Sequence, residues 1–178
     1  MELIEKTVKE NVIYSGKILS LKCDEVLLPN GKTSKREVVL HNGGSCVLAA
    51  KDGRILFVKQ YRYALGEAIY EIPAGKLEKG EDPKNTAIRE LEEECGLVAE
   101  DATLLYETYP TPGYSSEHIY IYRCDRFKNG KAHLDENEFL TGEWIEEEKV
   151  RRMMKDGQIK DGKTLIALLH YFLDKAEK

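Results

Sequence analysis

The feature that most constrains this 178-residue chain is a short acidic segment bracketed by helix start and stop signals. Asp82 can cap a helix, Pro83 suits its first position and Gly96 can end it. At about 100° per residue, the apolar residues of this helix share one side and the glutamates share a neighbouring arc. The first set is Ala87, Ile88, Leu91 and Cys95, and the second is Glu90, Glu93 and Glu94.

These glutamates lie at the C-terminal end of the helix, where negative charge is least favourable. In the last turn and a half, the macrodipole disfavours each carboxylate by about 0.3–1 kcal/mol. An acidic run is most often a solvated face, but this position favours a bound cation. Oxygen donors select hard divalent ions, so we expect Mg²⁺ as the cofactor, with Mn²⁺ as a possible substitute. Such an ion suits the hydrolysis of a phosphoanhydride, whose oxygens it can bridge.

The segment Gly75–Leu97 also satisfies a longer pattern, G-x5-E-x7-R-E-U-x-E-E-x-G-U, in which U is an aliphatic residue. This pattern is the Nudix box, and the chain therefore resembles the Nudix hydrolases. Glu81 and Gly75 are expected to shape the loop before the helix. Arg89 precedes Glu93 by four residues and is expected to orient that carboxylate in catalysis. The resemblance implies three metal ligands, namely the carbonyl of Ala74 and the side chains of Glu90 and Glu94.

Stretches outside the box resemble the ADP-ribose pyrophosphatase branch of this family. The loop 109–117 is similar to its S-P-G-x-x-x-E loop, with Thr111 in place of Ser. Alone, this loop would be an ordinary Pro-Gly turn between strands. Three further matches are Lys59–Arg62, Glu71–Gly75 and Lys35–Glu37. The substrate-binding residues that this resemblance implies are Arg36, Arg62, Glu71, Pro112, Gly113 and Glu117.

A second acidic run, Asp135–Glu138, precedes an expected strand. By default such a run is an exposed turn. In the branch named above, the corresponding loop supplies a general base and a further metal ligand. The resemblance therefore points to Glu136 as the base and to Glu138 as the ligand.

These features together imply Mg²⁺-dependent hydrolysis of ADP-ribose to AMP and ribose 5-phosphate. One alternative is a pyrophosphatase that acts on other nucleoside-diphosphate sugars or on dinucleotides. A second alternative is a nucleotide sensor without catalysis on the same fold. The unbroken set of carboxylates argues against the sensor, because a pure binder needs neither a base nor every metal ligand.

The expected fold is α+β, an α/β/α sandwich with mixed sheets between helices and an N-terminal antiparallel β extension. Residues 12–40 alternate in polarity around the turn Pro29–Gly31, which predicts a β-hairpin or short meander. A composition shift near residue 43 predicts a boundary between two parts, 1–42 and 43–178. A β ribbon alone is marginal in water, so residues 1–42 are expected to pack on the main domain or on another subunit. The resemblance implies a homodimer with this ribbon at its interface. Strands are expected at 45–50, 54–63, 68–75, 103–109, 118–124 and 139–145, and further helices at 146–157 and 163–178. The last helix has an apolar stripe through Leu165, Leu168, Leu169 and Phe172.

Composition narrows the class of partner. The net charge of −5 and the scattered Lys and Arg residues provide no basic field for a nucleic-acid backbone. No stretch approaches the roughly 20 apolar residues of a membrane helix, and the first residues lack the apolar core of a signal peptide. The four cysteines are widely spaced and are expected to be reduced thiols, and the four histidines form no constellation. We therefore expect a cytoplasmic enzyme with a small-molecule substrate, and neither a nucleic-acid nor a membrane partner.

Overall fold

The computed structural model describes residues 3–177, so residues 1, 2 and 178 of the expected first and last elements lie outside it. The chain falls into two compact units. One contains the residues up to Gly43 together with Tyr109–His118, and the other contains Gly44–Thr108 and Ile119–Lys178. Each unit has its own β-sheet, and the long helices belong to the second.

The first unit is an antiparallel sheet with little core. Its strands are β1 (Lys6–Lys9), β2 (Val12–Ser15), β3 (Leu19–Leu27) and β4 (Thr33–His41), and β3 pairs with the other three. The turn between β3 and β4 contains Gly31 at φ 82°, as the Pro29–Gly31 signal predicts. Among the described residues of this unit, Val26 is the one apolar side chain that is buried, and Val12, Ile13 and Tyr14 are more than half exposed.

The second unit is built on a seven-stranded sheet with the order β10-β11-β5-β6-β13, where β7 pairs with β6 and β8 with β5. The β5–β11 pair is parallel and the other pairs are antiparallel. A separate ribbon joins β9 (Leu97–Ala99) to β12 (Phe127–Asn129). The seven strands are β5 (Gly44–Lys51), β6 (Arg54–Arg62), β7 (Glu67–Glu71), β8 (Ala74–Lys76), β10 (Thr103–Thr108), β11 (Ile119–Cys124) and β13 (Leu140–Glu146).

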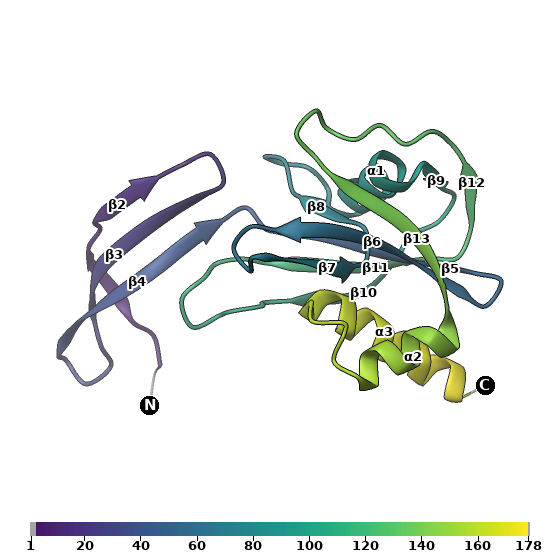
Figure 1. Ribbon diagram of the computed structural model, residues 1–178. Coiled ribbons are helices and arrows are strands. Elements are labelled where there is room, and N and C mark those ends of the chain that lie inside the picture. Colours follow the sequence, from purple (N-terminus) through teal and green to yellow (C-terminus); the bar gives the residue numbers. More distant parts are fainter. Residues whose placement is uncertain (1–2, 178) are drawn as a thin grey trace. The chain divides into compact units, whose positions relative to one another are not determined.

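Helices cover both faces of this sheet, with α1 (Pro83–Cys95) on one face and α2 (Glu147–Lys155) and α3 (Gly162–Ala176) on the other (Figure 1). Successive residues of β5 point to opposite faces, and all are buried until its last residue. Cys46 and Leu48 thus join the core beneath α2 and α3, whereas Val47 and Ala49 join the core beneath α1. The α+β sandwich expected from the sequence is confirmed.

The structure corrects some details of the prediction. The expected strand 68–75 is interrupted at Ile72 and Pro73, because proline has no N–H to donate to a strand ladder. Strands β1, β9 and β12 are three or four residues long, too short to show a clear alternation in the sequence. On α3, Leu169 is 54% exposed, and the buried face runs instead through Thr164, Ala167, Leu168, Tyr171 and Phe172.

Two other expectations concern the whole chain. Within residues 3–177, no helix is long and apolar enough to cross a membrane. All four cysteines are free thiols, with Cys46 and Cys124 buried and the other two half-buried.

Candidate active site

The acidic helix α1 has the boundaries that its sequence signals predict. Asp82 accepts a hydrogen bond from the Lys84 backbone N–H through Oδ1 at 2.8 Å, which caps the first turn. Gly96 adopts φ 64° and donates its N–H to the Glu92 carbonyl at 2.8 Å, which ends the helix. The last turn carries no basic residue. The carboxylates near this end therefore face an unfavourable helix dipole.

Glu90 and Glu94 are turned toward the short strand β8 and are buried, at 8% and 5% exposure. The Ala74 backbone N–H donates to Glu94 Oε2 at 3.1 Å. A Cβ atom on Gly75 would lie 1.7 Å from Glu90 Oε1, so the missing side chain of Gly75 makes the room for that carboxylate. The glycine and the two glutamates thus form one cradle of oxygen atoms between α1 and β8.

The electrostatics of this cradle favour a cation. Burial, followed by the charge of Glu90, raises the pKa of Glu94 to about 8. Burial also raises the pKa of Glu90, against the opposing effect of Arg89. Glu138, from the loop before β13, adds repulsion to both carboxyl groups. A divalent ion would relieve these costs, and the oxygen-only donor set fits Mg²⁺ or Mn²⁺.

In the described chain, no three acidic, His or Cys side chains already stand at metal-binding spacing. The carboxylates are instead turned to donors of the protein itself. Glu94 accepts from Ala74, and Glu90 accepts from Arg89 Nη1 at 2.8 Å. These bonds engage one oxygen of each glutamate, Glu94 Oε2 and Glu90 Oε1.

Arg89 donates hydrogen bonds to several carboxylates of the acidic face. Its Nη1 donates to Glu93 Oε2 at 2.7 Å, the contact expected from their spacing of four residues. Its Nε donates to Glu81 Oε1 at 3.1 Å, which ties the helix to the preceding loop. Glu81 also accepts from the Glu78 backbone N–H at 3.1 Å, in keeping with the loop-shaping expected of it. One guanidinium thereby fixes carboxylates from both ends of the box.

The acidic loop that contains Glu136 and Glu138 is tethered near the same end of α1. The His133 backbone N–H donates to the Glu93 carbonyl at 2.9 Å, and Gly130 donates to the Gly96 carbonyl at 2.7 Å. Glu136 is exposed, whereas Glu138 is half-buried and close enough to influence Glu90. The structure therefore brings this loop close to the cradle formed by Glu90 and Glu94.

Arg62 and Glu71 form a second charged cluster in the same unit. Glu71 is buried. Arg62 donates two hydrogen bonds to its carboxylate, from Nε at 2.5 Å and from Nη2 at 2.8 Å. Lys163 Nζ bonds to the same carboxylate and, at 3.0 Å, to Asp161 Oδ1. Lys163 and Asp161 were not among the residues predicted from the sequence. The available signal was a lysine in the first turn of a helix, where the dipole disfavours a cation.

The remaining expected site residues belong to the first unit. Arg36, on β4, is bonded to Glu5 through Nε at 2.8 Å and Nη2 at 2.6 Å. Pro112 and Gly113 lie on the loop 109–118, which adds to the edge of β4 through backbone bonds between Val39 and residues 114 and 116. Glu117 Oε1 lies 3.6 Å from His41 Nδ1.

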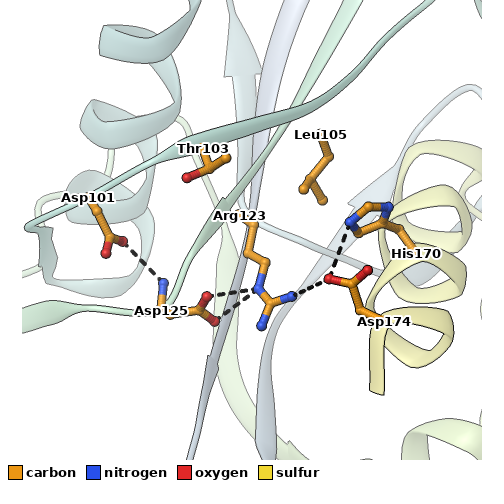
Figure 2. A pocket seen from close by; sticks show the side chains of 7 residues that line it. All are labelled: Asp101, Thr103, Leu105, Arg123, Asp125, His170 and Asp174. Atoms are coloured by element: carbon orange, nitrogen blue, oxygen red, sulfur yellow. Dashed lines mark hydrogen bonds and ion pairs between the residues drawn. The ribbon is translucent and has the colours of Figure 1, made fainter. Parts of the chain in front are cut away.

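A hollow of about 310 Å³ in the second unit is lined by none of the expected site residues. Figure 2 shows Arg123 between Asp125 and Asp174, with Nε 3.0 Å from Asp125 and Nη1 3.3 Å from Asp174. Asp101 accepts from Asp125 N and from Arg126 Nε. The charges of this hollow thus satisfy one another. Its full lining is Asp101, Thr103, Leu105, Arg123, Asp125, His170 and Asp174.

The chain is similar to known proteins in both sequence and fold. The NUDIX domain matches residues 39–168, and the nucleoside diphosphate sugar hydrolase N-terminal domain matches residues 5–39. In fold, the chain is similar to a crystal structure of an ADP compounds hydrolase, with a TM-score of 0.86, 18% identity and coverage of 99% of this chain and 98% of that one. This likeness supports the fold.

Three curated relatives cover nearly the whole chain. A methanol dehydrogenase activator of Bacillus methanolicus is 44% identical and an ADP-ribose pyrophosphatase of Bacillus subtilis is 42% identical, each over 98% of this chain and 96% of the relative. An ADP-ribose pyrophosphatase of Mycobacterium tuberculosis is 34% identical over 92% of this chain and 81% of the relative. With the domain match and the complete box, these similarities establish that the chain belongs to the Nudix hydrolase family.

Proposed function

We propose that this Nudix hydrolase cleaves the diphosphate of ADP-ribose to AMP and ribose 5-phosphate, using Mg²⁺. The observation that carries the proposal is the buried cradle in which Glu90 and Glu94 face Gly75, with the pKa of Glu94 raised to about 8. Buried glutamates of raised pKa call for an external cation, and a diphosphate is a ligand that such a cation binds. The two relatives that carry the name ADP-ribose pyrophosphatase support the choice of substrate.

In this proposal the ion is held by carboxylates of α1 and of the acidic loop, together with the backbone of β8. A bound Mg²⁺ supplies Lewis-acid neutralisation of the diphosphate charge. The burial of Glu90 and Glu94 beside β8 supports this role for them, and the electrostatic influence of Glu138 on both supports its inclusion. The proposed ligands are Ala74 through its carbonyl, Glu90, Glu94 and Glu138.

We assign proton transfer to the acidic loop. Glu136 is exposed on a turn tethered to α1, so it can approach a bound substrate and accept a proton from the attacking water. Arg89 orients Glu93 through its 2.7 Å bond. Glu93 then adds negative charge that favours the cation.

Substrate recognition is assigned to arginines and to the Pro-Gly loop. Arg62 uses Nε and Nη2 on Glu71, and its side chain remains 40% exposed, so it can also meet an anionic group. Arg36, Pro112, Gly113 and Glu117 are assigned by family resemblance. Arg36 would exchange its bond to Glu5 for the substrate.

We further propose a homodimer formed through residues 1–42, with residues 43–178 as the hydrolase domain. The first unit buries one apolar side chain in its described part and exposes Val8, Val12 and Ile13 on its sheet. A small sheet of this kind needs a cover to be stable, and a second copy of the chain supplies it. Light scattering should give twice the chain mass, and a monomeric mass would contradict this assignment.

The free thiols fit a reducing compartment, and we place the enzyme in the cytoplasm.

The test of the reaction is product analysis from ADP-ribose and Mg²⁺ in ¹⁸O-labelled water. We expect AMP and ribose 5-phosphate in equal amounts, with the label in one of them. A parallel panel should include GDP-mannose, because a GDP-mannose pyrophosphatase of Yersinia pestis is 28% identical over 77% of this chain. Faster turnover of another panel member would overturn the substrate, and calorimetric binding without any product would favour a sensor.

A further inference from the structure

Lys163 stands where a helix disfavours a cation. It follows Gly162 at the start of α3, whose N-terminus carries partial positive charge worth about 0.3–1 kcal/mol against it. Its side chain is nevertheless only 15% exposed. A buried lysine that also interacts unfavourably with the helix dipole requires a specific anionic partner.

The partner is the Glu71 carboxylate, which is 2% exposed. Lys163 bonds to Glu71 Oε2, and Arg62 approaches the same carboxylate with Nε at 2.5 Å and Nη2 at 2.8 Å. Asp161 caps α3 and lies 3.0 Å from Lys163 Nζ. Two anions and two cations therefore share one largely buried cluster, whose formal charges cancel.

The same end of α3 also supports the backbone that leads to the metal cradle. The Ile72 N–H donates to Thr164 Oγ1 at 2.9 Å in the interior. Two residues later, the Ala74 N–H donates to Glu94 Oε2 on α1. The segment 71–74 is thus held by α3 at its start and by α1 at its end.

We propose that Lys163 is a positioning residue that holds the Glu71 carboxylate, so that Arg62 presents its guanidinium to the phosphate groups of the substrate in a fixed orientation. This inference deepens the proposed function and rests on it. If Lys163 were absent, Arg62 would be the sole cation on Glu71, and the cluster would carry a net negative charge that repels a diphosphate. Lys163 itself need not touch the substrate.

The first test is Lys163→Met, which keeps most of the aliphatic stem and removes the charge. We expect the KM for ADP-ribose to rise about tenfold, the loss typical of one hydrogen bond to a charged group, with kcat changed less than about threefold. Lys163→Arg should restore KM to within about threefold of wild type, because it restores the cation. The matched control is Lys160→Met, three residues before Lys163. This change removes an exposed lysine that pairs with Glu67, and it should leave KM unchanged.

A double-mutant cycle separates positioning from general stability. Glu71→Gln removes the group that Lys163 holds, so Lys163→Met should add less than about twofold to KM in that background. A further tenfold rise would overturn the proposal. If Lys163→Met does not fold, Lys163→Arg provides the test. A folded Lys163→Arg variant whose KM is tenfold above that of wild type would overturn the role assigned to the cation.

Binding of an ADP-ribose analogue whose bridging oxygen is replaced by CH₂ distinguishes the two failures. Calorimetry should give about tenfold weaker binding to Lys163→Met than to wild type. If the analogue shows this difference but ADP-ribose is not hydrolysed, the proposed reaction fails and the role of Lys163 stands. If wild type hydrolyses ADP-ribose and the variant binds the analogue equally well, the role of Lys163 fails alone.

Discussion

Two glutamates of the second unit, Glu71 and Glu94, are almost equally buried and have opposite electrostatic environments. Burial alone would raise the pKa of both carboxyl groups. At Glu71 the hydrogen bonds from Arg62 and the charge of Lys163 outweigh burial and lower the pKa. At Glu94 burial and Glu90 act together and raise the pKa to about 8. One carboxylate is neutralised by the protein, and the other needs a cation from outside.

The helix ends express the same contrast. At the start of α3 a lysine opposes the dipole and is matched by an internal anion, Glu71. At the end of α1 glutamates oppose the dipole, and no basic residue stands in the last turn. A charge of the wrong sign at a helix end thus indicates a partner, and the tertiary structure tells whether that partner is part of the protein.

The largest expected effect is on turnover in Glu94→Gln. The change keeps the size of the side chain and its acceptor for the Ala74 N–H, but it removes a charge from the proposed metal cradle. We expect kcat to fall about 10³-fold, equivalent to about 4 kcal/mol, while the circular dichroism spectrum is unchanged. A folded variant that keeps a tenth of the activity would remove Glu94 from the site.

The same substitution at Glu71 should act on stability. Glu71→Gln removes the anion that Lys163 and Arg62 share and leaves Asp161 as the anion beside Lys163, and breaking a buried pair in this way costs about 3 kcal/mol. Urea denaturation of the metal-free protein at pH 7 measures this cost. The control Glu67→Gln breaks an exposed pair with Lys160 and should change the free energy of unfolding by less than about 0.5 kcal/mol. Equal stability of the two variants would contradict the contrast between the clusters.

The pH dependence of the metal-free protein should separate the two glutamates next. Between pH 4.5 and about 8, folded Glu94 keeps a proton that the unfolded chain has released, so this residue lowers the free energy of unfolding as pH rises. Glu71 has a lowered folded pKa, so its stabilisation is present above pH 4.5 and is lost as pH falls through that lower value. In urea titrations across this range, Glu94→Gln should flatten the slope. An unchanged slope would mean that Glu94 ionises freely.

The smallest expected effect concerns the space that Gly75 leaves. In Gly75→Ala the new Cβ would meet Glu90 Oε1 at 1.7 Å, so the carboxylate must swing away while the fold persists. We expect Mn²⁺ affinity, measured by electron paramagnetic resonance, to fall about tenfold. Gly162→Ala is the control, because its Cβ would meet nothing within 4 Å. Equal Mn²⁺ affinities in both variants would show that Glu90 does not depend on this space.

Much of the site could be predicted because its signals are local. Asp82, Pro83 and Gly96 act within one turn of α1, so the bounds of the helix follow from neighbouring residues. The contact between Arg89 and Glu93 follows from their spacing. Leu169 could not be placed in this way, because periodicity identifies an apolar stripe but not the part of it that a sheet covers.

The amino-acid sequence by itself determined the family, the acidic end of α1 and the candidate ligands of a divalent cation. Only the tertiary structure decided that Glu94 is buried without a cation and that Glu71 is buried with two of them. The reason is distance along the chain: Lys163 reaches Glu71 across 92 residues, and no local pattern encodes such a contact. Capping and periodicity act over a few residues, whereas burial and charge pairing depend on how the whole unit packs.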